Sequence, residues 1–156
     1  MNCKERLESY LRDNRVAFEM HHHPTAFTAQ EVAASEHTPG KMVAKVVMVL
    51  ADGELVMLAM PAPYQADLDR VSEVLGASEA RLAHEEEFAS AFPDCEVGAM
   101  PPFGNLYDLP VYVDEALAED ETIVVQAGTH TDTVRLRYAD FERLVEPTAA
   151  RFAYHA

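Results

Sequence analysis

The sequence predicts one α/β domain in which a mixed sheet packs against helices. Three observations support this prediction: apolar strand patterns alternate with amphipathic helix patterns, one strand pair is joined by a tight turn, and no repeat or linker divides the chain. The 156 residues are 49% hydrophobic and 25% charged, which suits a single globular domain over 1–156 with a core of its own.

The first two elements are an amphipathic helix and a strand. Leu7, Tyr10 and Leu11 recur at helical spacing with charged residues between them, which predicts a helix over 3–14. Apolar and polar residues alternate over 16–21, which is the period of a strand with one buried face.

A short helix and a hairpin come next. Thr28 and Glu31 are three residues apart and form a capping-box pattern that begins the helix. The run MVAKVVMVL at 42–50 is almost continuously apolar and rich in valine, which predicts a strand buried on both faces. The turn ADG then leads into a second strand at 54–61, which predicts a hairpin.

Helical and irregular segments follow the hairpin. Apolar residues on one face, and the glycine that ends the pattern, predict a helix over 66–76. We expect a short strand at 79–83 and a short helix at 84–92. The stretch CEVGAMPPFGN at 95–105 has two glycines and two adjacent prolines, which are first of all turn residues.

The last third is mainly strands. We expect them at 109–117, 121–128 and 132–137. The segment YADFERLV predicts a closing helix at 138–145, and we expect the residues after Pro147 to form a tail.

The charge balance narrows the possible partners. The chain has 12 basic and 27 acidic residues, a formal net charge of −15. Broad nucleic-acid grooves need a basic field because neutralised phosphates supply their affinity. We therefore expect no DNA binding, and any contact with RNA should be small and local.

The ends and the cysteines indicate a cellular setting. No apolar run approaches the roughly 20 residues of a membrane span, and the charged N-terminus lacks a signal-peptide core, so we expect no membrane partner. Cys3 and Cys95 make neither a disulfide framework nor a zinc pattern, which favours a reducing cytoplasm. With no visible base nearby, Cys95 is better explained as a small buried hydrophobe than as a nucleophile.

Lys45 is the most informative single residue. It lies in the middle of the apolar strand at 42–50, where a charged amine is costly unless it is paired or opens onto a cavity. One interpretation is an edge strand or a lysine whose ammonium reaches water. The other is a lysine at the floor of a pocket that binds an anionic or carbonyl oxygen.

The loop from Gly98 to Gly104 contains no acid, base or nucleophile, so its backbone is the candidate functional group. The prolines fix φ, and the glycines allow close approach of a ligand. The amides of Gly98, Ala99 and Met100 could hold a carbonyl oxygen or an oxyanion. Pro101 and Pro102 would stiffen the loop and Phe103 would wall a pocket. The alternative is a rigid connector.

Histidines offer two further candidates. His130 follows a strand in QAGTHTDT, where Gly128 permits tight geometry and Thr129 offers a hydroxyl. Alone, such a histidine is usually structural; paired with Lys45 it would contact substrate or orient a water. His21 and His23 could converge on a metal ion, but no third ligand is evident, so we expect no metal.

Four segments carry a family resemblance when taken together: HPTAFTAQEVAA, the strand around Lys45, CEVGAMPPFG and AGTHTDTVRLRYADFERL. In this order, and over nearly the whole chain, they resemble the YbaK/EbsC family, the editing domains associated with prolyl-tRNA synthetase. The resemblance implies a partly barrel-like mixed sheet surrounded by helices. It also implies hydrolysis of the ester between a wrong amino acid and the 3′ end of a tRNA.

The resemblance also assigns roles. It implies that Lys45 is required and lies near the 3′-terminal adenosine. It implies that the loop from Gly98 to Pro102 positions the aminoacyl group through its backbone, and that His130 lines the pocket. It implies no cofactor, because an activated ester needs only an oriented water or an assisting substrate group.

The implied partner is the acceptor end of a mischarged tRNA carrying a small amino acid such as Ala, Cys or Ser, with tRNA-Pro one candidate. The net charge predicts contact through few cations, with Lys41, Lys45 and Arg135 the candidates, and leaves room for a synthetase as a second partner. Val46 stands where several relatives place Asn. Two alternatives stay open: a non-catalytic module that binds a small molecule or the tRNA end, and a metal-dependent hydrolase using His21 and His23.

Overall fold

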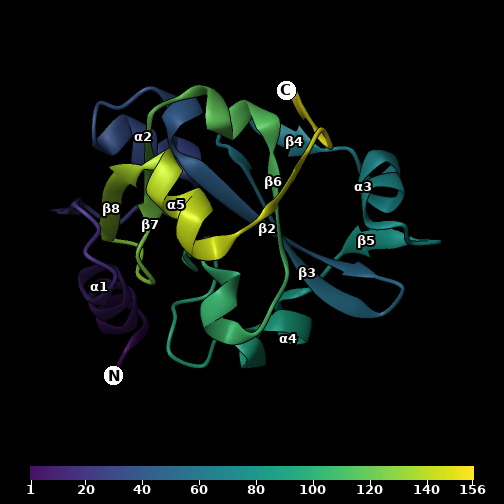
Figure 1. Cartoon of the computed structure of the whole chain (residues 1–156), viewed down its shortest axis with the longest axis horizontal. Helices are drawn as coiled ribbons and strands as arrows, with labels where there is room; N and C mark the ends of the chain where they lie inside the picture. Colours follow the sequence, from purple (N-terminus) through teal and green to yellow (C-terminus); the bar gives the residue numbers. More distant parts are fainter.

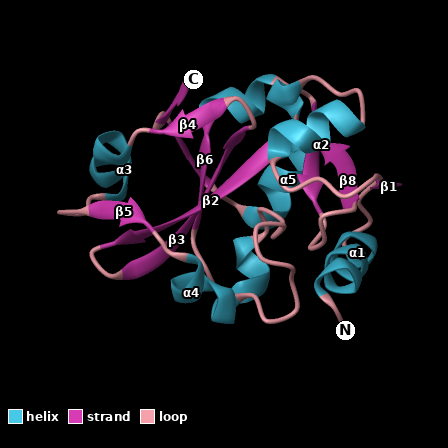
Figure 2. Cartoon of the chain, turned by 180° about the vertical axis from the view of Figure 1, so that it is seen from behind, coloured by secondary structure: helices cyan, strands magenta, loops and turns pink.

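The computed structural model describes residues 1–156 and has a mixed α/β fold with three sheets (Figures 1 and 2). The helices are α1 (Cys3–Asp13), α2 (Ala29–Ser35), α3 (Leu68–Leu75), α4 (Glu85–Phe88) and α5 (Tyr138–Val145). The strands are β1 (Phe18–His22), β2 (Ala44–Ala51), β3 (Glu54–Pro61), β4 (Tyr64–Ala66), β5 (Ala80–Leu82), β6 (Val111–Asp114), β7 (Thr122–Gln126), β8 (Asp132–Arg137), β9 (Thr148–Ala150) and β10 (Ala153–His155). The predicted fold class is confirmed.

The sheets are separate and do not close into a barrel. The five-stranded sheet has the order β5-β2-β3-β6-β9, the three-stranded sheet β1-β8-β7, and the two-stranded sheet β10-β4. A single parallel bridge connects Val43, just before β2 of the large sheet, to Val124 in β7 of the three-stranded sheet. Figure 1 shows α3 and β5 at one end of the molecule and α1 at the other.

Local sequence signals account for several elements. Asn2 and Glu5 form a reciprocal capping box at the start of α1, whose Leu7 and Leu11 are fully buried. Thr28 caps α2 as expected: its hydroxyl oxygen accepts a hydrogen bond from the Glu31 amide at 3.0 Å. The hairpin of β2 and β3 is also confirmed.

Two expectations at the C-terminal side are wrong. The strand predicted at 109–117 ends at Asp114, because its carboxylate accepts hydrogen bonds from the amides of Ala116, Phe152 and Ala153 and turns the chain into a 3₁₀ helix. The segment after Pro147 is not a tail: β9 pairs with β6, and β10 pairs with β4. These short strands bury too few residues to give a sequence pattern.

Strand β2 separates the core into two sides. Ala44 and Met48 face the main cluster of 21 buried residues, which also contains Met100 and Phe103. On the opposite face, Val49 packs under α3, while Val43, just before β2, packs under α2. Lys45 points to this second face, between the two smaller clusters. No helix of the structure is long and apolar enough to span a bilayer.

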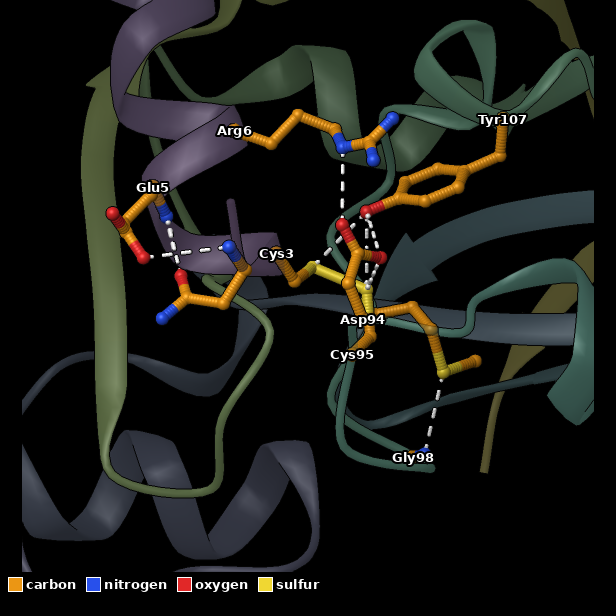
Figure 3. The surroundings of a disulfide bond; sticks show 9 residues. Cys3, Glu5, Arg6, Asp94, Cys95, Gly98 and Tyr107 are labelled. Carbon is orange, nitrogen blue, oxygen red and sulfur yellow. Dashed lines mark hydrogen bonds and ion pairs between the residues drawn. A yellow bond between two sulfur atoms is a disulfide. The ribbon is translucent and has the colours of Figure 1, made fainter.

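The expectation for the cysteines is wrong: Cys3 and Cys95 form a disulfide (Figure 3). Their Cα atoms are 5.0 Å apart, within the usual range for a bridge. They are 92 positions apart in the sequence, so no short-range spacing indicated that they lie close together. The Cys3 amide donates to the Asp94 carbonyl at 3.1 Å, so the first turn of α1 lies directly against the segment that precedes the loop.

Gly128 packs directly against this disulfide, which predicts a large effect of Gly128→Ala on stability. A Cβ atom there would lie 2.5 Å from Cys3 Sγ, and the φ of +93° is in the left-handed region. We expect a loss of about 2–4 kcal/mol in the free energy of unfolding. Gly53→Ala is the control, because its φ of +84° is similar but nothing lies within 4 Å of the added Cβ.

Denaturant unfolding of both variants measures the difference. Gly53→Ala should cost about 1–2 kcal/mol, the backbone strain alone. Equal losses in the two variants would contradict the packing of the disulfide on Gly128.

Candidate active site around Lys45

Lys45 lies in a pocket of about 240 Å³ on the α2 side of β2. On one edge of β2, Lys45 pairs with Met60 of β3. On the other edge, past the Val43–Val124 bridge, no strand pairs with Lys45. The ammonium donates to the Tyr64 carbonyl and forms no ion pair with an acidic side chain. The pocket lining is Thr28, Ala29, Gln30, Lys45, Ala62, Pro63, Tyr64, Gln65 and Ala156.

Burial makes this lysine unusual. Desolvation lowers the pKa of Lys45 below its ordinary value, because removal from water disfavours the ammonium. A half-buried amine with a carbonyl as its sole partner has donors to spare. It can therefore bind a carbonyl, ester or ribose oxygen that enters the pocket.

The loop that contains Gly98 has a defined turn. The Ala99 amide donates to the Glu96 carbonyl at 3.0 Å, and Gly98 occupies the third turn position with a φ of +85°, as in a type II turn. The Ala99 amide is therefore already used. The Gly98 amide lies 3.3 Å from Met100 Sδ, a weak acceptor, and the Met100 amide has no partner.

Most of this loop is buried. Ala99, Met100, Pro101, Pro102 and Phe103 are all buried, and Gly98 alone in the Gly98–Phe103 stretch is exposed. Phe103 packs edge-on against the rings of Tyr10 and Phe141 in the main core. The loop therefore presents Gly98 to solvent and uses its remaining side chains as an anchor.

His130 holds the loop in place. Its Nε2 donates to the Val97 carbonyl at 3.0 Å, and its own amide donates to Glu96 Oε1 at 2.9 Å. Its Cε1 would be 3.6 Å from a Cβ atom on Gly98. Nε2 carries the proton in this bond, and Nδ1 is buried and has no partner. The His130 ring therefore holds the turn in position.

Gly128 holds the same turn, whereas Thr129 binds Asp132. The Gly128 amide donates to the Ala99 carbonyl at 2.9 Å, and its carbonyl accepts from the Glu96 amide at 2.8 Å. The Thr129 hydroxyl donates to Asp132 Oδ2 at 2.6 Å. Burial alone would raise the pKa of Asp132, but hydrogen bonds from Thr129 and His22, with the charge of Lys4, hold it below its ordinary value.

The structure brings the predicted residues together as two neighbouring groups. Lys45 lies in its pocket, and none of the loop residues lines that pocket; His130 and Gly98 form the second group. The segment Ala26–Gln30 connects them. The Ala26 amide donates to the His130 carbonyl, the Phe27 ring lies 4.8 Å from the His130 ring, and Thr28 begins the pocket wall.

Phe27 and Gln126 are candidates that the sequence did not single out. The Phe27 side chain is 64% exposed between the two groups. Gln126 is 8% exposed, its Nε2 is shut off from solvent, and its side chain makes no hydrogen bond. Val43 and Val124 are joined by a parallel bridge. Lys45 comes two residues after Val43 and Gln126 two residues after Val124, so their side chains are on the same face. A glutamine within the apolar strand TIVVQ was the available signal.

The other predicted groups lie elsewhere. His21 Nε2 is 3.2 Å from Glu19, and buried His23 donates through Nδ1 to the Pro24 carbonyl. The sole cluster with three potential metal ligands is Cys3, Asp94 and Cys95, in which the sulfurs are bonded to each other. A larger open cavity of about 470 Å³ contains Arg135, whose guanidinium is held by Thr38 and Glu36.

Comparisons with known proteins identify the family and the fold. A family model described as the aminoacyl-tRNA editing domain matches residues 23–144. Proline–tRNA ligases of Bacillus mycoides and Bacillus cereus are 28% identical over 95 residues, which is 61% of this chain and 17% of each ligase. The chain thus spans a small part of these relatives.

Solved structures match along almost the whole chain. A hypothetical protein superposes with a TM-score of 0.86 and 16% identity, covering 96% of this chain and 99% of the other. A candidate trans-editing enzyme for prolyl tRNA synthetase superposes with a TM-score of 0.83 and 19% identity, covering 97% of both chains. At these identities the likeness shows the fold.

Proposed function

Because this chain belongs to the aminoacyl-tRNA editing domain family, we propose that it is a trans-editing deacylase. It hydrolyses the ester between a mischarged amino acid and the 3′ end of a tRNA. The observation that carries this proposal is Lys45, a half-buried amine in a small pocket that forms no ion pair with an acidic side chain. The similarity to proline–tRNA ligases supports a substrate on tRNA-Pro.

The chemistry needs few groups. The Lys45 ammonium binds an oxygen of the ester or of the terminal ribose and stabilises negative charge as the bond breaks. The unpartnered Met100 amide is a second donor, beside the exposed Gly98. No side-chain base lies next to Lys45, so the nucleophile is an oriented water, assisted by a ribose hydroxyl or another substrate group.

Pocket size supports a small aminoacyl group such as Ala, Cys or Ser. About 240 Å³ is less than the volume that encloses drug-sized ligands. Val46 is on the opposite face of β2 from Lys45 and packs against the main core, so its apolar side chain suits that position. Discrimination between amino acids would come from the volume of the pocket, and a difference of one methylene separates two substrates only weakly.

Contact with the tRNA would be confined to its acceptor end. Nine of the twelve Lys and Arg side chains lie within 4.0 Å of an acidic oxygen. Lys41 pairs with Asp120, and Arg135 with Glu36, so two of the three expected cations are already neutralised. A synthetase that holds the rest of the tRNA is therefore part of the proposal.

Gln126→Met tests whether the unpartnered carboxamide positions the substrate. Methionine keeps the length and burial of the side chain but cannot make its hydrogen bonds. We expect kcat/KM to fall about tenfold, because a hydrogen bond to a polar substrate is lost. Thr133→Val is the control: Thr133 is opposite Gln126 in β8, but its hydroxyl is already bound to Glu36 at 2.6 Å. That variant should lose stability and keep kcat/KM.

The lowered pKa of Lys45 predicts the pH dependence. The active form is the ammonium, so activity is full below the folded-state pKa and is lost as pH rises through it. Because burial lowers this pKa, activity should be lost at a pH below the ordinary pKa of lysine. The measurement is kcat/KM against pH, with spontaneous ester hydrolysis subtracted; a profile flat up to the ordinary pKa of lysine would contradict the role of burial.

The test of the function is hydrolysis of a panel of aminoacyl-tRNAs. Labelled Ala, Cys, Ser, Thr and Pro are each loaded on tRNA-Pro and on their cognate tRNAs. We expect rapid release of one small amino acid, unchanged by a metal chelator. Release at the buffer rate across the panel would remove the deacylase, and loss of activity in chelator would favour a metal-dependent hydrolase.

A further inference from the structure

We propose that the Cys3–Cys95 disulfide is a redox switch that sets the geometry of the loop from Gly98 to Pro102. The inference rests on the proposed function, because that loop is assigned there to substrate positioning. Reduced by a dithiol, the bridge gives two cysteine thiols and the dithiol becomes a cyclic disulfide. Reoxidation by a disulfide reverses the step.

The disulfide adjoins both chain segments that fix the loop: the segment before Gly98 and the segment at Gly128. Cys95 is three residues before Gly98 in the segment CEVG. On the other side, Cys3 packs on Gly128, whose amide and carbonyl hold the Ala99 carbonyl and the Glu96 amide. The bond therefore joins α1 covalently to the segment that leads into the turn, and Cys3 also packs on the Gly128 segment that holds the turn.

Polar groups surround the bridge and hold its environment in place (Figure 3). The Tyr107 hydroxyl donates to Asp94 Oδ1 at 3.0 Å and lies 3.3 Å from Cys3 Sγ and 3.2 Å from Cys95 Sγ. Arg6 Nε donates to Asp94 Oδ2 at 3.0 Å. Burial, followed by the nearby Asp94 carboxylate, raises the pKa of Tyr107, so it is a neutral donor beside the bridge.

Reduction should move Cys95 rather than Cys3. Two unbonded thiols need more room than a disulfide, and Cys3 has none, because it is fully buried in α1 and wedged against Gly128. Cys95 is only half-buried and belongs to an irregular segment. The displacement therefore passes along Glu96 and Val97 to Gly98 and weakens the turn.

The expected consequence is a less active reduced enzyme. A displacement of about 1 Å at a positioning element can cost up to about 100-fold in rate, so we expect kcat/KM to fall about tenfold on reduction. The two cysteines are the only ones in the chain, so a thiol reductant has no other protein target.

The test compares the full chain in its oxidised, reduced and reoxidised forms. Free thiols are counted with a thiol reagent, and deacylation is measured on the best substrate of the panel. We expect activity to fall with dithiothreitol and to return on reoxidation, while a Cys3→Ser/Cys95→Ser double variant stays at the reduced level in both conditions. Equal kcat/KM in the oxidised and reduced forms would overturn the switch.

A second readout separates this inference from the proposed function. Amide hydrogen exchange over 95–104 should be about tenfold faster in the reduced form, because local opening becomes easier. Hydrogen exchange can be measured even if the chain hydrolyses no aminoacyl-tRNA. In that case the proposed function would be wrong, while faster exchange in the reduced form would still support the switch. Unchanged exchange in this segment would overturn the switch in either case.

Discussion

Lys45→Met is expected to lower kcat/KM for ester hydrolysis by about 100-fold or more, the loss typical of one donor that stabilises developing negative charge. Methionine fills the same space, so the pocket should keep its shape. Stability should be unchanged or slightly higher, because the variant no longer buries an amine whose pKa is lowered by desolvation. Steady-state kinetics and thermal unfolding of the same preparations measure both effects.

Lys41→Met is the matched control for this prediction. The Lys41 side chain is 67% exposed and paired with Asp120 across 3.4 Å, outside the pocket. Removing it should change kcat/KM less than about twofold, since exposed ion pairs contribute little. A Lys45→Met variant as active as Lys41→Met would place the chemistry somewhere other than this pocket.

Gly98→Ala is expected to lower kcat/KM by about 10-fold to 100-fold with a moderate loss of stability. The φ of +85° is one that alanine adopts only with strain, and the new methyl group would contact His130 Cε1 at 3.6 Å. The turn from Glu96 to Ala99 should shift, and the Met100 amide with it.

Gly53→Ala is the control that separates the effect of backbone strain at a glycine turn from the effect of Gly98's position in the candidate site. Gly53 is in the hairpin between β2 and β3, with a φ of +84° and no atom within 4 Å of an added Cβ. Both variants should lose about 1–2 kcal/mol of stability. Only Gly98→Ala should lose activity; a similar loss of activity in both would mean that the effect is general destabilisation.

The sequence predicts the fold wherever local chemistry decides the outcome. Thr28 begins α2 because its side chain satisfies a free amide, and its short-range pattern with Glu31 suffices to find the cap. The apolar run around Lys45 and the tight turn after it identify the β2–β3 hairpin for the same reason.

The sequence does not predict features that depend on contacts between distant segments. The disulfide joins residues 92 positions apart, and no spacing rule connects a pair of cysteines at that distance. Strand β10 forms because Asp114 holds the amides of Phe152 and Ala153, a contact across nearly 40 residues. The relation between Lys45 and Gln126 depends on one parallel bridge.

His130 shows the same limit within the candidate site. Its position after a strand and beside Gly128 favoured a structural histidine, and a role in the pocket was implied only by the family resemblance. In the tertiary structure its ring nitrogen binds the Val97 carbonyl and its amide binds Glu96. Its contribution would be to position the turn. Lys45 is the opposite case, since a lysine in an apolar strand already had the floor of a pocket as one of its two interpretations on chemical grounds.

The most direct test of the account is a product analysis at limiting enzyme. A mischarged tRNA labelled in both the amino acid and the 3′-terminal adenosine is incubated with a hundredth of its amount of the oxidised chain. We expect free amino acid over many turnovers, with the adenosine still on the tRNA. Binding without turnover, or release no faster than with the Lys45→Met chain, would contradict a deacylase and leave a module that binds the tRNA end.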